Sequence, residues 1–101
     1  MNTREKVLAA IYDAVEEVND LLPPESVLAK DATEVLMGNG RKLDSLQLVQ
    51  LIVAVEQHLS DTLDLAVTLA DERAMSQKSS PFRTIGTLTD YATSLVEATV
   101  R

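Results

Sequence analysis

The serine at position 45 lies where a loop meets a helix, between Asp44 and Leu46. Residues 38–40 read Gly-Asn-Gly, a composition typical of loops, and an apolar helical run begins at Leu46. Asp44 is expected to be the N-cap of that helix, which makes Ser45 its first residue, near the positive end of the helix dipole. No side chain beside Ser45 in the sequence is suited to act as a base. We therefore expect the Ser45 hydroxyl to be modified by another protein rather than to attack a substrate.

The other residues that could act in catalysis or metal binding form no recognisable catalytic or metal-binding set in the sequence. His58 is the only histidine and has no nucleophile in register, so we expect a surface histidine near a helix end. The acidic pairs at 16–17 and 71–72 diverge on a helix and are expected to be solvated. The absence of cysteine excludes thiolate metal sites and cysteine nucleophiles, and no phosphate-binding or calcium-binding loop motif is present. The sequence therefore predicts neither an enzyme nor a metal site.

Length and composition indicate one small α-helical domain. The chain has 101 residues, 46% of them hydrophobic, with three glycines and three prolines, too few for the turns of an all-β fold. We expect a single domain over residues 1–101 with an aliphatic core. The net charge of −7 disfavours nucleic acid and anionic membranes as partners and favours basic protein surfaces. No leader or membrane-length apolar run is present, so we expect a cytoplasmic monomer that does not insert into membranes.

The first helix should start at Asn2, which has capping-box spacing to Glu5, and stop before the prolines at 23 and 24. Its apolar residues follow helical periodicity: Val7, Leu8, Ile11, Ala14, Val15 and Val18. Residues 23–42 form a long connection with too many apolar residues for a solvated linker. Short helical turns are expected in it at 25–29 and at 32–36, the second capped by Asp31.

Residues 45–59 should form the most apolar helix, either central to the fold or with a strip left for a partner. Leu46, Val49 and Val53 make one stripe that rises from Ser45.

Two more helices are expected after it. A third helix is predicted over 61–75, capped by Asp61 or Asp64, followed by a loop at 77–81. The last helix should present one apolar face formed by Leu88, Tyr91, Ala92, Leu95 and Val96.

The stretch Leu-Asp-Ser-Leu at 43–46, followed by an aliphatic helix, resembles the attachment site of acyl carrier proteins and of the carrier domains of polyketide and nonribosomal peptide synthetases. Val35 and Leu36 match the apolar pair that this family often has before its glycine. Residues 82–91 resemble the family's closing motif, an aromatic and a basic residue, then Thr-Ile, then a helix. The resemblance implies an all-α, acyl-carrier-like four-helix bundle with a long first loop and an extended third-helix region.

The resemblance also implies a function. A phosphopantetheinyl transferase would move 4′-phosphopantetheine from coenzyme A to Ser45, with a divalent metal held mainly by the transferase. The phosphoprotein so formed would hold acyl or aminoacyl intermediates as thioesters for fatty-acid, polyketide or related biosynthesis in lipid metabolism. Its partners would be the transferase and the enzymes that load and process the acyl group.

The sequence departs from the family in the helix after the serine. Two positions that are usually acidic are Gln47 and Gln50, which leaves Asp44 and Glu56 as the charges that flank this face. Docking should then depend on apolar contact, with weak salt dependence. The residues expected to bind partners are Asp44, Leu46, Val49, Gln50, Val53 and Glu56.

The connection 60–81 is also longer than is usual in the family, and no motif explains its length. The alternative function is a helical adaptor that is never modified and binds a partner through the helix after Ser45.

Overall fold

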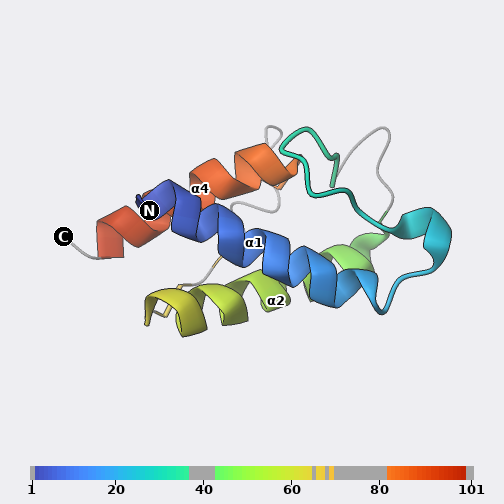
Figure 1. Ribbon diagram of the computed structural model, residues 1–101, viewed down its shortest axis with the longest axis horizontal. Helices are drawn as coiled ribbons and strands as arrows, with labels where there is room; N and C mark the ends of the chain where they lie inside the picture. Colours follow the sequence, from blue (N-terminus) through green and yellow to red (C-terminus); the bar gives the residue numbers. More distant parts are fainter. Residues whose placement is uncertain (1, 37–42, 65, 68, 70–81, 100–101) are drawn as a thin grey trace.

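The computed structural model describes residues 2–36, 43–64, 66–67, 69 and 82–99. Within these ranges the chain forms three α-helices and one 3-10 turn, and no strand beyond an isolated bridge (Figure 1). The elements are α1 (Thr3–Asn19), η1 (Pro24–Ser26), α2 (Ser45–Leu63) and α4 (Ile85–Thr99). The all-α class is therefore confirmed, whereas a fourth helix lies outside what the described residues can show.

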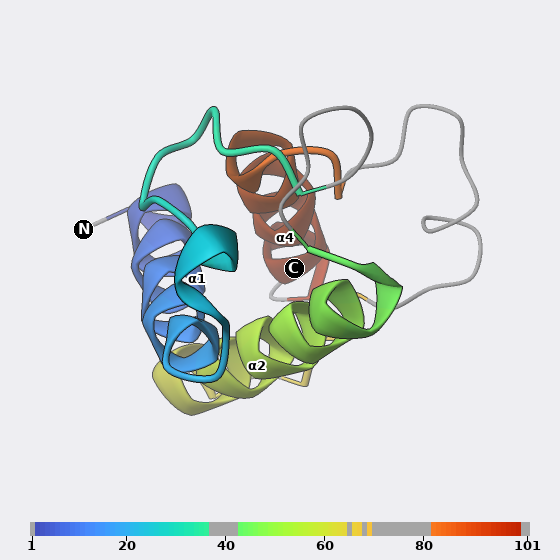
Figure 2. The ribbon, with the colours of Figure 1, turned by 90° about the vertical axis from the view of Figure 1, so that its right-hand side faces the viewer.

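Helix α1 packs against both α2 and α4, and it runs in the opposite general direction to each of them (Figures 1 and 2). We expected the helix after Ser45 to be either central or open to a partner along one strip. Among the described helices, α1 makes the main contacts with both others. Helix α2 both contributes to the core and leaves Leu46, Val49 and Val53 exposed along one strip.

The core is aliphatic, as predicted, with one buried aromatic ring. Phe82 is fully buried and meets Tyr91 edge-on, with ring centroids 5.9 Å apart. Within the described residues, twenty-one aliphatic side chains complete the buried hydrophobic set. These are Val7, Ala10, Ile11, Ala14, Val15, Val18, Leu28, Leu36, Leu43, Leu48, Leu51, Ile52, Ala54, Val55, Leu59, Val67, Leu69, Ile85, Leu88, Ala92 and Val96. The apolar faces predicted for the first and last helices are thus the ones that pack, with Leu8, Tyr91 and Leu95 half-buried at the edge.

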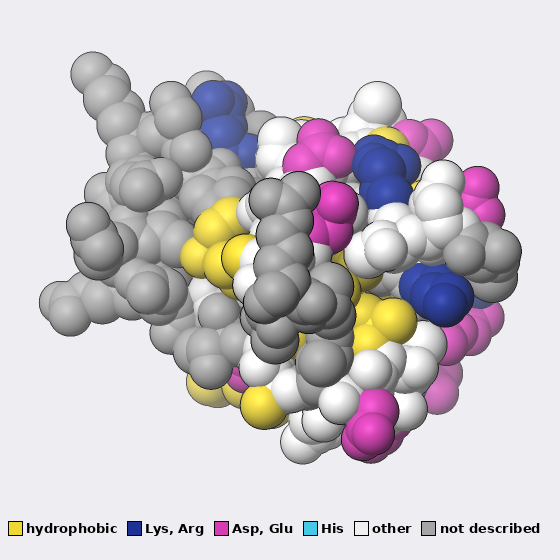
Figure 3. All heavy atoms as spheres, turned by 90° about the vertical axis from the view of Figure 1, so that its left-hand side faces the viewer, with side chains coloured by type: hydrophobic (Ala, Val, Ile, Leu, Met, Phe, Trp, Pro, Cys, Tyr) yellow, Lys and Arg dark blue, Asp and Glu magenta, His cyan; other side chains and the backbone are white. Residues whose placement is uncertain are grey.

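The surface at the end where α1 begins and α4 ends mixes acidic and basic side chains, with hydrophobic atoms scattered among them (Figure 3). No helix in the described part of the chain has the length and apolar character needed to cross a bilayer.

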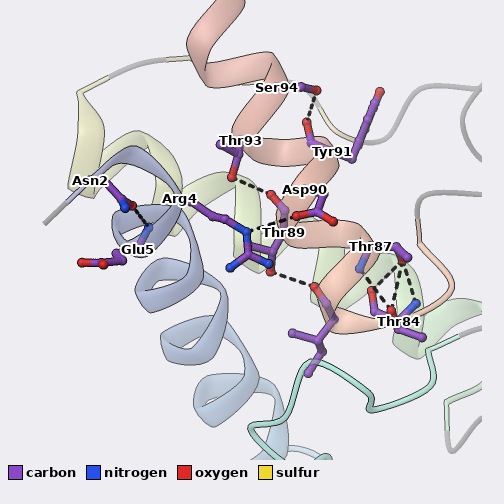
Figure 4. A network of polar contacts seen from close by, with 11 residues as sticks. Asn2, Arg4, Glu5, Thr84, Thr87, Thr89, Asp90, Tyr91, Thr93 and Ser94 are labelled. Atoms are coloured by element: carbon purple, nitrogen blue, oxygen red, sulfur yellow. Dashed lines mark hydrogen bonds and ion pairs between the residues drawn. The ribbon is translucent and has the colours of Figure 1, made fainter.

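Polar contacts fix the start of α1 against α4 (Figure 4). The side chain of Asn2 accepts a hydrogen bond from the Glu5 N–H at 2.8 Å, so the predicted cap forms. In the same turn, Arg4 Nε donates to Asp90 Oδ1 at 3.1 Å, an exposed pair that adds at most about 1 kcal/mol. Thr89 is buried, and its hydroxyl donates to the Ile85 carbonyl at 2.7 Å.

The chain turns sharply after α1 because Asn19 holds the returning loop. The Asn19 side chain donates to the Leu28 carbonyl at 3.0 Å and accepts from the Leu28 N–H at 2.8 Å. This amide therefore satisfies both backbone groups of a residue whose own side chain is buried.

The first loop contains less helix than predicted. The helical turn expected at 25–29 is confirmed in part as η1, at Pro24–Ser26, and the turn expected at 32–36 is a tight turn over residues 31–34. Asp31 does cap this turn, because its carboxylate accepts hydrogen bonds from the Thr33 N–H and from the Thr33 hydroxyl. These two hydrogen bonds, the backbone one first, lower the Asp31 pKa. A helix cannot continue because Val35 extends into a bridge with Thr84.

That bridge connects the first loop to the start of α4. The Leu36 N–H donates to the Arg83 carbonyl at 2.7 Å, and the Ile85 N–H donates to the Glu34 carbonyl at 3.1 Å. The next amide, of Gly86, donates to the Ala32 carbonyl at 2.8 Å. The loop thus accepts hydrogen bonds from amides that a helix N-terminus leaves without intrahelical partners.

The third helix predicted over 61–75 is wrong where the structure describes it. Asp61 belongs to α2, which runs on to Leu63 rather than ending near 59, because residues 60–62 are compatible with helix and Leu63 continues the apolar face of Leu59. Asp64 ends α2 in the left-handed conformation, with φ 55°. Residues 66, 67 and 69 are not helical, and 70–75 lie outside the described residues, as do the loop at 77–81 and most of the long connection 60–81.

Replacing Asn19 by alanine should lower the free energy of unfolding by about 2 kcal/mol, because two hydrogen bonds to Leu28 are lost together. Urea unfolding followed by circular dichroism measures the change. Lys6→Ala, an exposed substitution in the same helix, should stay within about 0.5 kcal/mol of wild type. Equal stability of the two variants would show that the Asn19 clamp contributes nothing.

Replacing Gly86 by alanine should destabilise the fold by about 1 kcal/mol, although alanine is ordinarily the better helix former. A Cβ at this position would lie 3.0 Å from the Ala32 carbonyl oxygen and 3.3 Å from the Ala32 Cβ, so the loop would have to move away from α4. Thermal unfolding gives the sign directly. A higher melting temperature in Gly86→Ala would mean that the loop yields without loss.

Candidate functional site

The start of α2 is fixed by a complete capping box. The Asp44 carboxylate accepts from the Gln47 N–H at 2.8 Å, and the Gln47 side chain accepts from the Asp44 N–H at 3.0 Å. The Asp44 carbonyl also takes the first intrahelical bond, from the Leu48 N–H at 2.9 Å. Leu43, just before the cap, is buried and anchors the approach to the helix. Ser45 is therefore the first residue of α2, as predicted.

The role of Gln47 was missed at the sequence level. We treated Gln47 as a position where the carrier family usually has an acid, although the spacing Asp-x-x-Gln is itself a capping-box signal. Its side chain binds the backbone of Asp44, so it stabilises the first turn of the helix.

The first turn of α2 suits a serine that carries a phosphodiester. A helix N-terminus favours a negative group through its dipole and its free N–H groups. Asp44 and Leu46, on either side of Ser45, are exposed, so a second protein has access to this turn. The residues present thus fit 4′-phosphopantetheine attached at Ser45, the group that the sequence predicts.

Leu46, Val49 and Val53 form an exposed apolar stripe along α2. Leu46 is 67% exposed, Val49 39% and Val53 43%. The opposite side of the helix is buried in the core and includes Leu51 and Ile52. The stripe predicted from the sequence thus lies at the surface, whereas its binding of a partner stays a prediction.

A groove lies beside this stripe, between α1 and α2. Its volume is about 300 Å³, and its lining is mostly apolar. The residues that line it are Glu17, Val18, Leu21, Val49, Gln50, Val53, Ala54 and Gln57. Leu21 stands at its α1 side and is 74% exposed, the most exposed large hydrophobic residue in the described part of the chain.

The other predicted partner-binding residues have separate surroundings. Gln50 is exposed and lines the groove. The carboxylate of Glu56 accepts a hydrogen bond from the Leu69 N–H, so it holds the segment after α2 against the helix. His58 is half-buried, and its Nε2 lies 2.9 Å from Glu17 Oε2. This contact links α2 to α1 and agrees with a structural role for His58.

Some predicted features fall outside the described residues. The Gly-Asn-Gly loop at 38–40 is among them. Within the ranges that are described, no three His, Asp or Glu side chains gather as a metal site would require.

Searches of protein-family models, of curated proteins and of solved structures gave no match to this chain. Its function is therefore argued from the residues of the site.

Replacing Asp44 by alanine should lower the free energy of unfolding by about 1 kcal/mol, because the Gln47 N–H loses its acceptor. Asp44→Asn keeps an acceptor at the same position without the charge and should retain most of the stability. Chemical denaturation of both variants separates the cap from the charge. An equal loss in the two would assign the effect to the charge at the helix dipole.

Proposed function

We propose that this chain is a carrier protein that holds acyl or aminoacyl intermediates as thioesters on a 4′-phosphopantetheine arm attached to Ser45. The observation that carries the proposal is the position of Ser45, the first residue of a capped helix whose exposed face begins with Leu46. The chain itself catalyses no step. It works as a monomer in the cytoplasm, and the acyl chemistry belongs to the arm and to partner enzymes.

Attachment is a transfer from coenzyme A catalysed by a phosphopantetheinyl transferase. The Ser45 hydroxyl oxygen forms a bond to the phosphorus that bears pantetheine, and the bond from that phosphorus to the bridging pyrophosphate oxygen breaks. Adenosine 3′,5′-bisphosphate leaves, and a base of the transferase takes the hydroxyl proton. The terminal thiol of the arm supplies the thioester linkage.

Three features of this chain support the proposal. The capping box of Asp44 and Gln47 holds the first turn without using the serine, and the helix N-terminus favours the phosphodiester charge. The exposed stripe starts one residue after Ser45, so a transferase or processing enzyme can hold α2 beside the attachment point. The order of α1, long loop, α2 and α4 agrees with the four-helix bundle that the resemblance implies.

A helical adaptor is the second candidate, because the same stripe would serve a protein that is never modified. Leu46, Val49 and Val53 are exposed whether or not Ser45 carries a group. The two functions differ in their dependence on the Ser45 hydroxyl. An adaptor keeps its function in Ser45→Ala, whereas a carrier loses all loading.

Incubation of the wild-type chain with coenzyme A and a promiscuous phosphopantetheinyl transferase should add the mass of one phosphopantetheine group. Ser45→Ala should gain nothing, because the accepting hydroxyl is absent. Ser60→Ala is the matched control: it removes another serine of α2, which is exposed, and should load like wild type. Intact-mass spectrometry reads all three samples.

Two outcomes would contradict the carrier. Mass gain in Ser45→Ala would place the modification elsewhere. No gain in any sample, with a transferase that loads a known carrier in parallel, would favour the adaptor.

A further inference from the structure

The groove between α1 and α2 combines apolar and acidic side chains, a combination that the attachment of an arm at Ser45 does not require. It begins at Val49 and extends to Gln57 on α2. At 1.5 Å per residue, these positions lie about 6 and 18 Å from Ser45 along the helix. A partner seated in the groove would therefore contact α2 from about one turn beyond the attachment point.

The floor of the groove is apolar. Val49 and Val53 line it from α2, and Leu21 lines it from the end of α1 (Figure 1 shows the two helices side by side). All three are exposed, and Leu21 stands out at 74%. The α2 part from Val49 to Gln57 spans about 12 Å, the length of about two turns of helix.

The α1 side of the groove is acidic. Glu17 lines it, and Glu16 and Asp20 are exposed in the same turn of α1. The last turn of α1 contains no basic residue, although the negative end of a helix dipole ordinarily favours cations. Lys30 pairs with Glu16, and His58, which is charged only when protonated, pairs with Glu17. Among the described residues that line the groove, Glu17 is the acidic one, and Asp20 is exposed three residues later. We call these two residues the acidic rim.

These features identify the occupant by charge complementarity. Aliphatic side chains at i, i+3 or i+4, and i+7 of a helix fit an apolar groove of this length. Lysine or arginine along one flank fits the acidic rim. A second copy of this chain fits poorly, since it carries a net charge of −7 and the same acidic rim.

We propose that the groove docks an amphipathic helix of a partner protein. Its aliphatic side chains seat against Leu21, Val49 and Val53. Its basic flank faces Glu17 and Asp20. This docking surface includes α1, so it extends beyond the face of α2 that the carrier or adaptor function requires.

Two synthetic helical peptides of about 14 residues, or about four turns, test the proposal. Both have leucines at helical spacing, one with lysines along the flank and the other with glutamates there. The lysine peptide should bind the full chain about tenfold more tightly at low salt, and the difference should shrink as salt is added. Amide chemical-shift changes in NMR titrations should centre on Leu21, Val49, Gln50 and Val53.

Variants of the chain locate the binding. Leu21→Ala and Glu17→Gln should each weaken the lysine peptide about fivefold or more, because each removes one part of the groove. Val27→Ala is the control: Val27 is a large hydrophobic residue, 40% exposed, that does not line the groove and belongs to no predicted binding surface. It should stay within about twofold of wild type, and melting temperatures of all variants exclude misfolding.

The proposal is overturned if neither peptide binds saturably, if both bind equally, or if Val27→Ala weakens binding as much as Leu21→Ala. Dilution-dependent shifts at the groove without peptide would assign it to a second copy of the chain and would also overturn it. Ser45→Ala should bind the lysine peptide like wild type. Failure of phosphopantetheine loading would therefore leave this result unaffected.

Discussion

Pairing between the first loop and the beginning of α4 is the constraint on which the rest of the fold depends. A helix N-terminus has amides without partners, and an irregular loop has carbonyls without partners. Here the amides of Ile85 and Gly86 donate to carbonyls of the loop, while Leu36 returns a bond to Arg83. Leu36 and Ile85 are buried at the same junction. The loop is thereby fixed at both ends of its path, by α1 through the Asn19 clamp and by α4 through these bonds.

The sequence could predict those features that depend on neighbouring residues. Asn2 and Asp44 cap helices because their acceptors reach amides three residues away, and the apolar faces of α1 and α4 repeat at helical spacing. The end of α2 could not be read in this way, because Leu63 continues the apolar face of that helix and equally fits a new one. A contact thirteen residues apart, Glu56 to the Leu69 N–H, holds the chain beyond that end, and periodicity carries no information about it.

The candidate site divides in the same manner. The position of Ser45 and the stripe of Leu46, Val49 and Val53 follow from one helix, so the sequence predicted them. The groove needs Leu21 and Glu17 from α1, which meet α2 only through tertiary packing. The capping role of Gln47 could have been predicted from the sequence, because its spacing from Asp44 is local. The comparison with the carrier family instead directed the prediction to the acidic side chain that Gln47 replaces. Two positions of α2 that are usually acidic in the carrier family are Gln47 and Gln50 here, while acidic side chains lie close to the end of α1.

This arrangement gives α2 two regions with independent supports, the capped first turn and the groove. The first turn is held by the Asp44–Gln47 capping box, whereas the groove depends on the packing of α1 and on the contact between Glu17 and His58. Loss of the cap should therefore loosen the helix start while the groove keeps its shape, and loss of charge on the rim should leave the serine in place. A carrier must present one attachment point to several enzymes in turn. A docking surface that begins about 6 Å along the helix from that point, less than the ~10 Å diameter of a helix, would bring a bound partner next to the serine.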